Sequence, residues 1–424
     1  MGAKGSILIV AGSILQVPAV EAARRLGLRV VVTDRNPECA CAALADEFYP
    51  LDIFDVEGHV ELARSLPDLC AVFTCACDAT VTVAMVAREV GLPGLPVEVA
   101  QKCRSKIITR ISLDGKAPQP KFTFTPDVNV ARQVVTEFGN SIIKAISGSG
   151  GRGHTRVTTA DDVTAKVFDR AAALSRSGMV LIEEMLYGVE MSVETLWYDG
   201  EMRPLNAVER PFAHRPWELT RYTSALPDLS PFGVTQEAAD SHTIELGHFN
   251  PAALSCAQYI QIYEVVEAAG QAVGMDRAAG GHIFKGDLIL TDDGPKVLEV
   301  TPRLSGNFDS GRTSPLAFGT DYTQGAIKLA LGQVPDWRCF TPRWYRHAVC
   351  LSKFARPGMV REIHGLQAAR QKAEVIVKRD VGTEVPELTN YAAQVAYVVA
   401  DGYTRAEAMG KAMRAMEKLE WVTE

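Results

Sequence analysis

The residues best suited to chemistry in this chain begin with Lys144, near the end of an apolar run over residues 140–146. A glycine-rich segment follows, Gly148-Ser149-Gly150-Gly151-Arg152-Gly153. Glycines let backbone N–H groups approach an anion closely, and a lysine adds a point charge. Because the lysine precedes the glycines, the pattern is not a Walker A loop. The segment predicts a phosphate-binding loop, with a plain β-hairpin turn as the alternative.

A second group of polar residues ends the next predicted strand. Residues 179–184 read Met-Val-Leu-Ile-Glu-Glu, and Glu190 opens the strand that follows. The carboxylates of Glu183, Glu184 and Glu190 are suited to accept hydrogen bonds from an exocyclic amine and from a ribose diol. The alternative is an acidic turn that faces solvent.

The third group is a pair of acids followed by an arginine. Asp287 lies on a predicted strand, Asp293-Gly294 is a hairpin dipeptide, and Glu299 lies on the return strand. The hairpin can therefore bring Asp287 and Glu299 onto one face of adjacent strands. Such oxygen ligands suit Mg²⁺, with waters and phosphates completing its shell. Arg303, just beyond, is suited to stabilise a transferring phosphoryl group. The alternative is two exposed acids and a surface arginine.

The elements that precede these groups predict a doubly wound α/β domain over about residues 1–100. Buried strands are expected over 6–11, 28–33 and 70–75, with helices over 16–27 and 79–90. The first turn reads Ala11-Gly12-Ser13-Ile14-Leu15-Gln16 and lacks the G-x-G-x-x-G pattern of a dinucleotide site. An NAD-dependent oxidoreductase is therefore a weaker alternative.

The rest of the chain alternates strands and helices around the polar groups. The expected elements are a basic-faced helix over 100–112, strands over 140–146, 154–158 and 179–184, a helix over 161–175, strands over 190–210 and 281–300, and a final helix over 404–419. Residues 211–240 have the weakest pattern and predict a mobile loop near a site.

Composition excludes several classes of protein. The chain has 424 residues, 47% of them hydrophobic, and a formal net charge of −7. Nucleic-acid binders usually carry a basic stripe, and none is found. No apolar run is long enough for a membrane span. The nine cysteines fit no zinc pattern and predict reduced thiols in the cytoplasm.

Six features follow one another along the chain. They are a basic helix, a strand with a lysine, a glycine loop, a strand that ends in acids, a hairpin with paired acids, and an arginine. The order resembles the ATP-grasp superfamily, in the branch of biotin carboxylases, carbamoyl-phosphate synthase halves and L-amino-acid ligases. Further matches are Gly91-Leu92-Pro93-Gly94, Ser105-Lys106, residues 245–252 and residues 302–306. The resemblance implies a mixed α/β and α+β fold: a Rossmann-like pre-ATP-grasp domain over 1–112, a two-lobed ATP-grasp domain over 113–333 (small lobe about 113–186, large lobe about 187–333), and a C-terminal α+β lobe over 334–424.

The resemblance also implies roles for the matching residues. For ATP, Lys106 and Lys144 would contact phosphates, and the loop with Ser149, Gly150, Gly151 and Gly153 would close over them. Glu183 would face the adenine amine, Glu184 and Leu186 would offer backbone hydrogen bonds, and Glu190 would bind the ribose. Asp287 and Glu299 would hold Mg²⁺ or Mn²⁺. Arg303 would stabilise an acyl-phosphate, and Lys144 and Asn307 would be further catalytic residues.

Two departures from the family pattern concern the metal. Many relatives carry Glu where this chain has Asp287, and many carry Asn where it has Thr301. Thr is the poorer ligand, so a full two-metal site is in doubt, although Asn307 is placed to compensate in part.

The function implied is an ATP-dependent carboxylate ligase that forms an acyl-phosphate and passes the acyl group to an amine, with an amino-acid-like acceptor. Candidates for binding these substrates are His214, Arg215, Ser305 and Arg312. A carboxylase or carbamoyl-phosphate-synthase-like enzyme acting on bicarbonate or carbamate is the first alternative. A non-catalytic ATP-binding sensor is the second. The resemblance also implies a homodimer.

Overall fold

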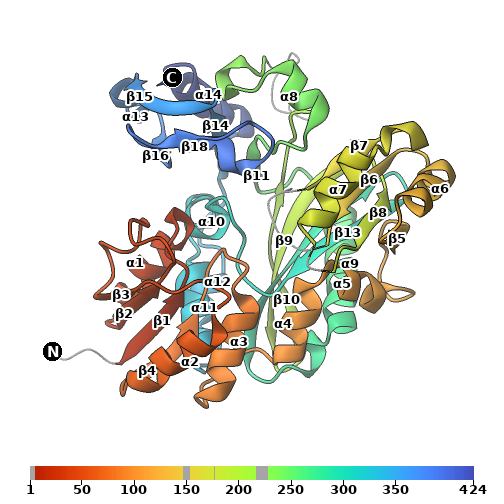
Figure 1. The fold of residues 1–424 in the computed structure, drawn as a ribbon. Helices are drawn as coiled ribbons and strands as arrows, with labels where there is room; N and C mark the ends of the chain where they lie inside the picture. Colours follow the sequence, from red (N-terminus) through yellow and green to blue (C-terminus); the bar gives the residue numbers. More distant parts are fainter. Residues whose placement is uncertain (1–4, 147–152, 176, 216–227) are drawn as a thin grey trace.

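The chain folds around one parallel sheet and several antiparallel sheets, which confirms the mixed α/β class predicted from the sequence (Figure 1). The computed structural model describes residues 5–146, 153–175, 177–215 and 228–424. Among these residues, no helix is both long and apolar enough to cross a membrane.

The N-terminal sheet is parallel and has the strand order β3-β2-β1-β4. Its elements are β1 (Ser6–Val10), α1 (Val17–Arg25), β2 (Arg29–Thr33), β3 (Glu47–Tyr49), α2 (Val56–Ser65), β4 (Leu69–Phe73) and α3 (Thr80–Glu89). Alternate residues of β1 enter separate hydrophobic cores, with Ile7 and Ile9 on one side of the sheet and Leu8 and Val10 on the other. Burial on both faces explains the continuous apolar run in the sequence.

The basic helix expected over residues 100–112 is interrupted at Ser105. It forms two helices, α4 (Val97–Arg104) and α5 (Lys106–Leu113), because Ser105 has an extended backbone and caps the second one. Its side chain accepts from the backbone N–H of Ile108, as an N-cap serine does. The break places Lys106 in the first turn of α5 and turns Arg110 inward, where it is buried.

A small antiparallel sheet with the order β5-β8-β6-β7 follows. Its elements are β5 (Phe122–Thr125), α6 (Val128–Phe138), β6 (Ser141–Ala145), β7 (Thr155–Val157), α7 (Ala165–Ala173) and β8 (Val180–Glu184). Apolar residues of α6 and α7 pack with Ile143 and Ile182 of the strands in a separate core. The opposite side carries Lys144 and Glu183, which alternate with the core positions along their strands.

The large sheet has eight strands in the order β13-β12-β9-β10-β11-β14-β18-β16. These are β9 (Val189–Tyr198), β10 (Glu201–Glu209), β11 (Gly247–Asn250), β12 (Gly281–Thr291), β13 (Gly294–Thr301), β14 (His347–Phe354), β16 (Glu374–Val377) and β18 (Gln394–Gly402). Strand pairing therefore runs across residue 334, from the predicted ATP-grasp domain into the predicted C-terminal lobe.

The two faces of the large sheet differ in polarity. On one face, Met191, Val193 and Phe284 pack against helix α9 (Cys256–Val273). On the other face, Leu196 and Ile283 contact the core of the N-terminal sheet through helix α11 (Tyr322–Ala330). Polar residues continue this second face toward the middle of the molecule. Since side chains alternate along a strand, one stretch of sequence supplies both a core and a polar wall.

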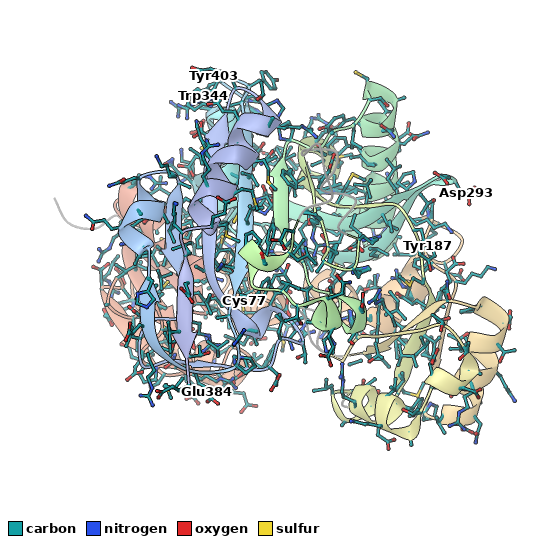
Figure 2. The ribbon with its side chains drawn as sticks, turned by 90° about the horizontal axis from the view of Figure 1, so that it is seen from above. Cys77, Tyr187, Asp293, Trp344, Glu384 and Tyr403 are labelled. Carbon is teal, nitrogen blue, oxygen red and sulfur yellow. The ribbon has the colours of Figure 1, made fainter. Side chains whose placement is uncertain are left out.

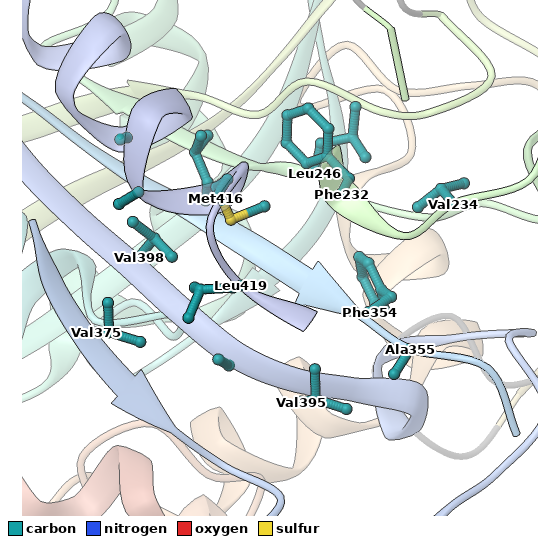
Figure 3. Packing of buried hydrophobic residues seen from close by; sticks show 14 of the residues in the cluster. Phe232, Val234, Leu246, Phe354, Ala355, Val375, Val395, Val398, Met416 and Leu419 are labelled. Atoms are coloured by element: carbon teal, nitrogen blue, oxygen red, sulfur yellow. The ribbon is translucent and has the colours of Figure 1, made fainter. Parts of the chain in front are cut away.

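The C-terminal residues build a core of their own, shown in Figure 3, where Val375, Val398 and Met416 lie together. Its further elements are α13 (Leu366–Arg370), α14 (Arg405–Met416) and the sheet β17-β15-β19, with β15 (Gly358–His364), β17 (Glu384–Val385) and β19 (Glu420–Thr423). Part of the segment expected to be a loop belongs to this core. Residues 216–227 lie outside the described residues, but Phe232, Val234 and helix α8 (Gln236–Ser241) pack here.

Candidate active site

A cavity of about 710 Å³ lies where the three parts of the chain meet. The N-terminal sheet contributes the segments that follow β1, β2 and β4, including Asp34 and Asp78. The large sheet contributes its polar face, and Lys378 and Tyr391 come from the C-terminal residues. Cys77, which also lines the cavity, lies near the middle of the molecule in Figure 2. The carboxyl ends of parallel strands are the usual place for a ligand site.

Asp287 and Glu299 lie opposite each other on β12 and β13, as the hairpin predicted. Ser192 is the partner of Asp287 on the other neighbouring strand, β9. All three line the cavity. One row across the sheet therefore presents a hydroxyl and two carboxylates to the same space.

The two acids have different surroundings. The Asp287 side chain is buried, and its oxygens accept from Lys285 Nζ at 2.7 and 2.8 Å and from Ser192 Oγ at 2.5 Å. Arg210 Nη1 is 3.4 Å away. Burial alone would raise the pKa of Asp287, but Lys285 and Arg210 hold it well below its usual range. Glu299 has a side chain that is 42% exposed and lies 3.7 Å from Lys106 Nζ.

Arg303 follows β13 and points into the cavity between the sheets. Its Nη2 is 3.6 Å from Asp78 Oδ1, and its Nη1 donates to the carbonyl of Leu304. Its Nε is buried with no hydrogen-bond partner among the described residues. The same side chain lines a second cavity of about 430 Å³ between α3, β4, β12 and α11. A buried donor without a partner suits an anionic ligand.

Lys144 and Glu299 line one small cavity of about 20 Å³, together with Lys106 and Glu183. Because Glu299 also lines the main cavity, the two spaces adjoin at this residue. The lysine of the small sheet and the acid of the large sheet therefore lie close together, as binding of one triphosphate between the two sheets requires.

Glu183 is engaged on both oxygens. Lys144 Nζ donates to Oε2 at 2.5 Å, and Arg110 Nε donates to Oε1 at 2.5 Å. Burial raises the pKa of Glu183, but the two cations outweigh it and bring the pKa to about 2. Arg110 also donates to the carbonyls of Val297 and Leu298 on β13. Glu183 thus anchors two cations, and its carboxylate is not open to an adenine amine as the resemblance implied.

The other residues predicted to bind adenine and ribose follow Glu183 in the sequence. Glu184 accepts from the backbone N–H of Lys121 and lies 3.3 Å from Lys296 Nζ. Leu186 is partly exposed. Glu190 binds Arg215 Nη2 at 2.6 Å. Arg215, a substrate candidate, therefore lies beside the predicted ribose-binding acid.

The other substrate candidates are divided by the structure. Ser305 lines the main cavity, and its buried side chain lies beside the carboxylates of Glu194 and Asp309. His214 is outside the cavity lining, and burial together with Arg215 lowers its pKa to about 3. Arg312 pairs instead with Glu21 and Glu374, which lie far apart in the sequence. Of these candidates, Ser305 alone is within the described cavity wall.

Asn307 lies in the cavity wall with a positive φ of 52°. Its side-chain amide donates to Glu245 Oε1 and to the hydroxyl of Tyr391, both at 3.0 Å. Glu245 is buried and also binds Arg210. Asn307 therefore joins the large sheet to the C-terminal residues at the floor of the cavity.

The predicted phosphate loop is described only at its end. Ser149, Gly150 and Gly151 lie outside the described residues. Gly153 has a φ of 75°, and a side chain there would meet Ala145 and Leu174. This position therefore requires glycine for both backbone and space.

Sequence reasoning missed four charged residues of the wall: Arg110, Arg210, Glu245 and Lys285. A signal existed for Lys285, because it precedes Asp287 by two positions on one strand and so shares its face. Arg210 and Glu245 come from opposite ends of a long connection. No local pattern could have paired them.

The donor set fits a nucleotide with one divalent cation. Lys106, Lys144 and Arg303 supply positive charge, and Glu299 is the carboxylate that remains partly open. Within the described residues, no three His, Cys, Asp or Glu side chains gather as a metal site. A cation here would need oxygens from the ligand itself, as Mg²⁺ bound to phosphates has.

Two segments of the chain match known domain families. Residues 20–94 match the ATP-grasp N-terminal domain, and residues 354–424 match the L-amino acid ligase C-terminal domain 2. An uncharacterized protein of Sinorhizobium fredii, y4rH, is 26% identical over 414 residues, which are 95% of this chain and 79% of that protein.

Carnosine synthase 1 of Gallus gallus is 25% identical over 365 residues, and the match spans 78% of this chain but 36% of that enzyme. The crystal structure of L-amino acid ligase from Bacillus licheniformis has the same fold, with a TM-score of 0.74, 19% identity and 99% of each chain covered. The two domain matches and the shared fold confirm the resemblance to the ATP-grasp superfamily that the sequence indicated.

Proposed function

We propose that the protein is an ATP-dependent carboxylate–amine ligase that joins an amino-acid-like acceptor to a carboxylate activated as an acyl-phosphate. The observation that carries the proposal is the main cavity, which is lined by Glu299, Arg303 and Ser305 together. The adjoining small cavity adds Lys106 and Lys144. This arrangement is suited to hold a triphosphate beside a second substrate.

In this proposal, ATP lies between the small sheet and the large sheet. Lys144 and Lys106 bind phosphates, Glu190 binds the ribose, and the backbone at Glu184 and Leu186 binds the adenine. Residues 1–112, 113–333 and 334–424 act as the three domains around it. Glu183 keeps Lys144 in position through their short ion pair. Mg²⁺ bound with the nucleotide would be held by Glu299 and would neutralise phosphate charge.

The chain's own residues would act by positioning and by charge. The substrate carboxylate attacks the γ-phosphate in line, and positive charge must meet the three equatorial oxygens. Arg303 supplies it, since its Nε is buried and has no partner among the described residues. The walls of the cavity keep water away from the acyl-phosphate, which would otherwise be hydrolysed. An amine then attacks the acyl carbon and releases phosphate.

An amino-acid-like acceptor is supported by the mixed charge of the cavity. Acidic side chains from the N-terminal sheet and basic side chains from the large sheet line the same space, including Asp34, Asp78, Arg210 and Lys378. Both signs of charge suit a zwitterion better than bicarbonate. The amino acid ligase among the similar structures agrees with this choice.

The test is an ADP-release assay with MgATP and pairs of amino acids, followed by mass spectrometry of the product. We expect ADP release that depends on both substrates. Arg303→Ala should reduce turnover by about a thousandfold, the upper range for one charge-stabilising group, while ATP still binds. Arg338→Ala is the control, since Arg338 is an exposed arginine paired with Asp336 on the surface. A chain that binds no ATP, or an Arg303→Ala variant with full activity, would refute the proposal.

A further inference from the structure

The number of divalent cations that the site binds depends on whether Asp287 is free to ligate one, which matters if the proposed function holds. The resemblance implied that Asp287 and Glu299 both ligate metal. In the structure, Asp287 Oδ1 accepts from Lys285 and Ser192, and Oδ2 accepts from Lys285 as well. Arg210 approaches Oδ1 from the end of β10. The lone pairs of this carboxylate are thus largely engaged by protein donors.

Of the two cations that engage Asp287, Lys285 is buried and Arg210 is partly exposed. Lys285 is 6% exposed, and it is held in place by β12, which also carries Asp287. Arg210 is fixed by its second partner, Glu245, in a short ion pair. A metal ion at Asp287 would leave the buried ammonium of Lys285 and the guanidinium of Arg210 facing it without this counter-charge, which is unfavourable.

Thr301, the next position of β13 on the same face as Glu299, is not a better metal ligand than Asp287. Thr301 lies opposite Lys285 in the β12–β13 register, and its hydroxyl is buried with no hydrogen-bond partner among the described residues. Glu299, one step along the same strand face, is instead 42% exposed toward the cavity. The Asp287 carboxylate is therefore occupied by protein donors, whereas the Glu299 carboxylate is accessible from the cavity.

We propose that the enzyme works with one divalent cation, held by Glu299 and the nucleotide phosphates, and that Lys285 closes the second metal position. Asp287 is then a positioning residue, which holds the ammonium of Lys285 and the guanidinium of Arg210 against the cavity. The fixed cations balance Asp287 and Glu245, so the wall has little net attraction for another ion.

The test counts Mn²⁺ bound in the presence of saturating ADP, by electron paramagnetic resonance of the full-length chain. We expect one Mn²⁺ per bound ADP in the wild type. Asp287→Asn should still bind one Mn²⁺ per ADP, with an Mn²⁺ affinity changed less than twofold. Glu299→Gln should weaken the Mn²⁺ affinity more than tenfold. Equal losses in the two variants, or two Mn²⁺ in the wild type, would overturn the inference.

Lys285→Met tests the blocking role directly. Removing the ammonium should raise the count from one Mn²⁺ to two. Lys353→Met is the matched control, because Lys353 is similarly buried but donates to the carbonyl of Pro231. If a folded Lys285→Met variant still binds one Mn²⁺ per ADP, Lys285 does not block a second metal position. If Lys285→Met does not fold, the Mn²⁺ affinity of Asp287→Asn is the test of whether Asp287 ligates metal. A wild type that binds no ADP would instead remove the proposed function itself.

Discussion

Replacing Glu183 with Gln should destabilise the nucleotide-free protein more than any comparable change at the site. The side chain is 1% exposed and holds Arg110 and Lys144 at 2.5 Å each. Gln keeps the shape but removes the charge, so two buried cations lose their only shared anion among the described residues. Removing one partner of a buried ion pair costs about 3–5 kcal/mol.

The pKa of Glu183 gives an independent magnitude. The folded chain lowers it from 4.5 to about 2, because Arg110 and Lys144 outweigh the effect of burial. At about 1.4 kcal/mol per pKa unit, this corresponds to roughly 3 kcal/mol. Since the folded pKa is the lower one, this stability is present above pH 4.5 and is lost as the pH falls toward 2.

The assay is thermal unfolding without nucleotide at pH 7.5 and again near pH 3.5. At pH 7.5, a loss of roughly 3 kcal/mol should lower the Tm of Glu183→Gln by about 6–12 °C. This takes about 2–4 °C per kcal/mol, the range for a domain of about 150–250 residues. Near pH 3.5 the difference should shrink. Glu184→Gln is the control, because its ion pair with Lys296 is partly exposed and should contribute less than about 1 kcal/mol. Equal Tm values for the two variants at pH 7.5 would refute the reasoning.

Three further outcomes are expected. Gly270→Ala should lower the Tm although alanine favours helix, because the added methyl would meet the buried ring of Trp197 and overpacking costs about 1–3 kcal/mol; an unchanged Tm would show that the ring moves freely. Ser105→Ala should cost about 1 kcal/mol in thermal unfolding by removing the cap of α5, with Ser105→Asp restoring it. Burial lowers the pKa of Lys353 from 10.5 to about 8, so stability should rise with pH across this range, and the Tm of the wild type relative to Lys353→Met should increase between pH 8 and 10.

The acid pair could be predicted because its geometry is local. The hairpin turn at Asp293-Gly294 pairs β12 with β13 and so brings Asp287 near Glu299, and a register shift between Asp287 and Leu288 places the two acids directly opposite each other. The strands and helices of the N-terminal sheet were predictable for a similar reason, since runs of β-branched residues alternate there with helical spacing.

The partners of these acids were not predictable, because they are brought together by tertiary structure. Arg110 reaches Glu183 across 73 positions of sequence, and Arg210 reaches Glu245 across 35. The predicted basic face of residues 100–112 also assumed one continuous helix. The extended backbone at Ser105 rotates α5 relative to α4 and carries Arg110 from the surface into the protein.

The alternation of core and cavity residues along β9, β12 and β13 limits how this chain can evolve. A one-residue shift of β12 would turn Lys285 and Asp287 toward helix α9 and would turn apolar residues such as Phe284 toward the cavity. Point substitutions are therefore the tolerated changes along these strands. The exposed tip at Asp292 and Asp293 lies outside the paired strands, so length variation can accumulate there without moving the reactive groups.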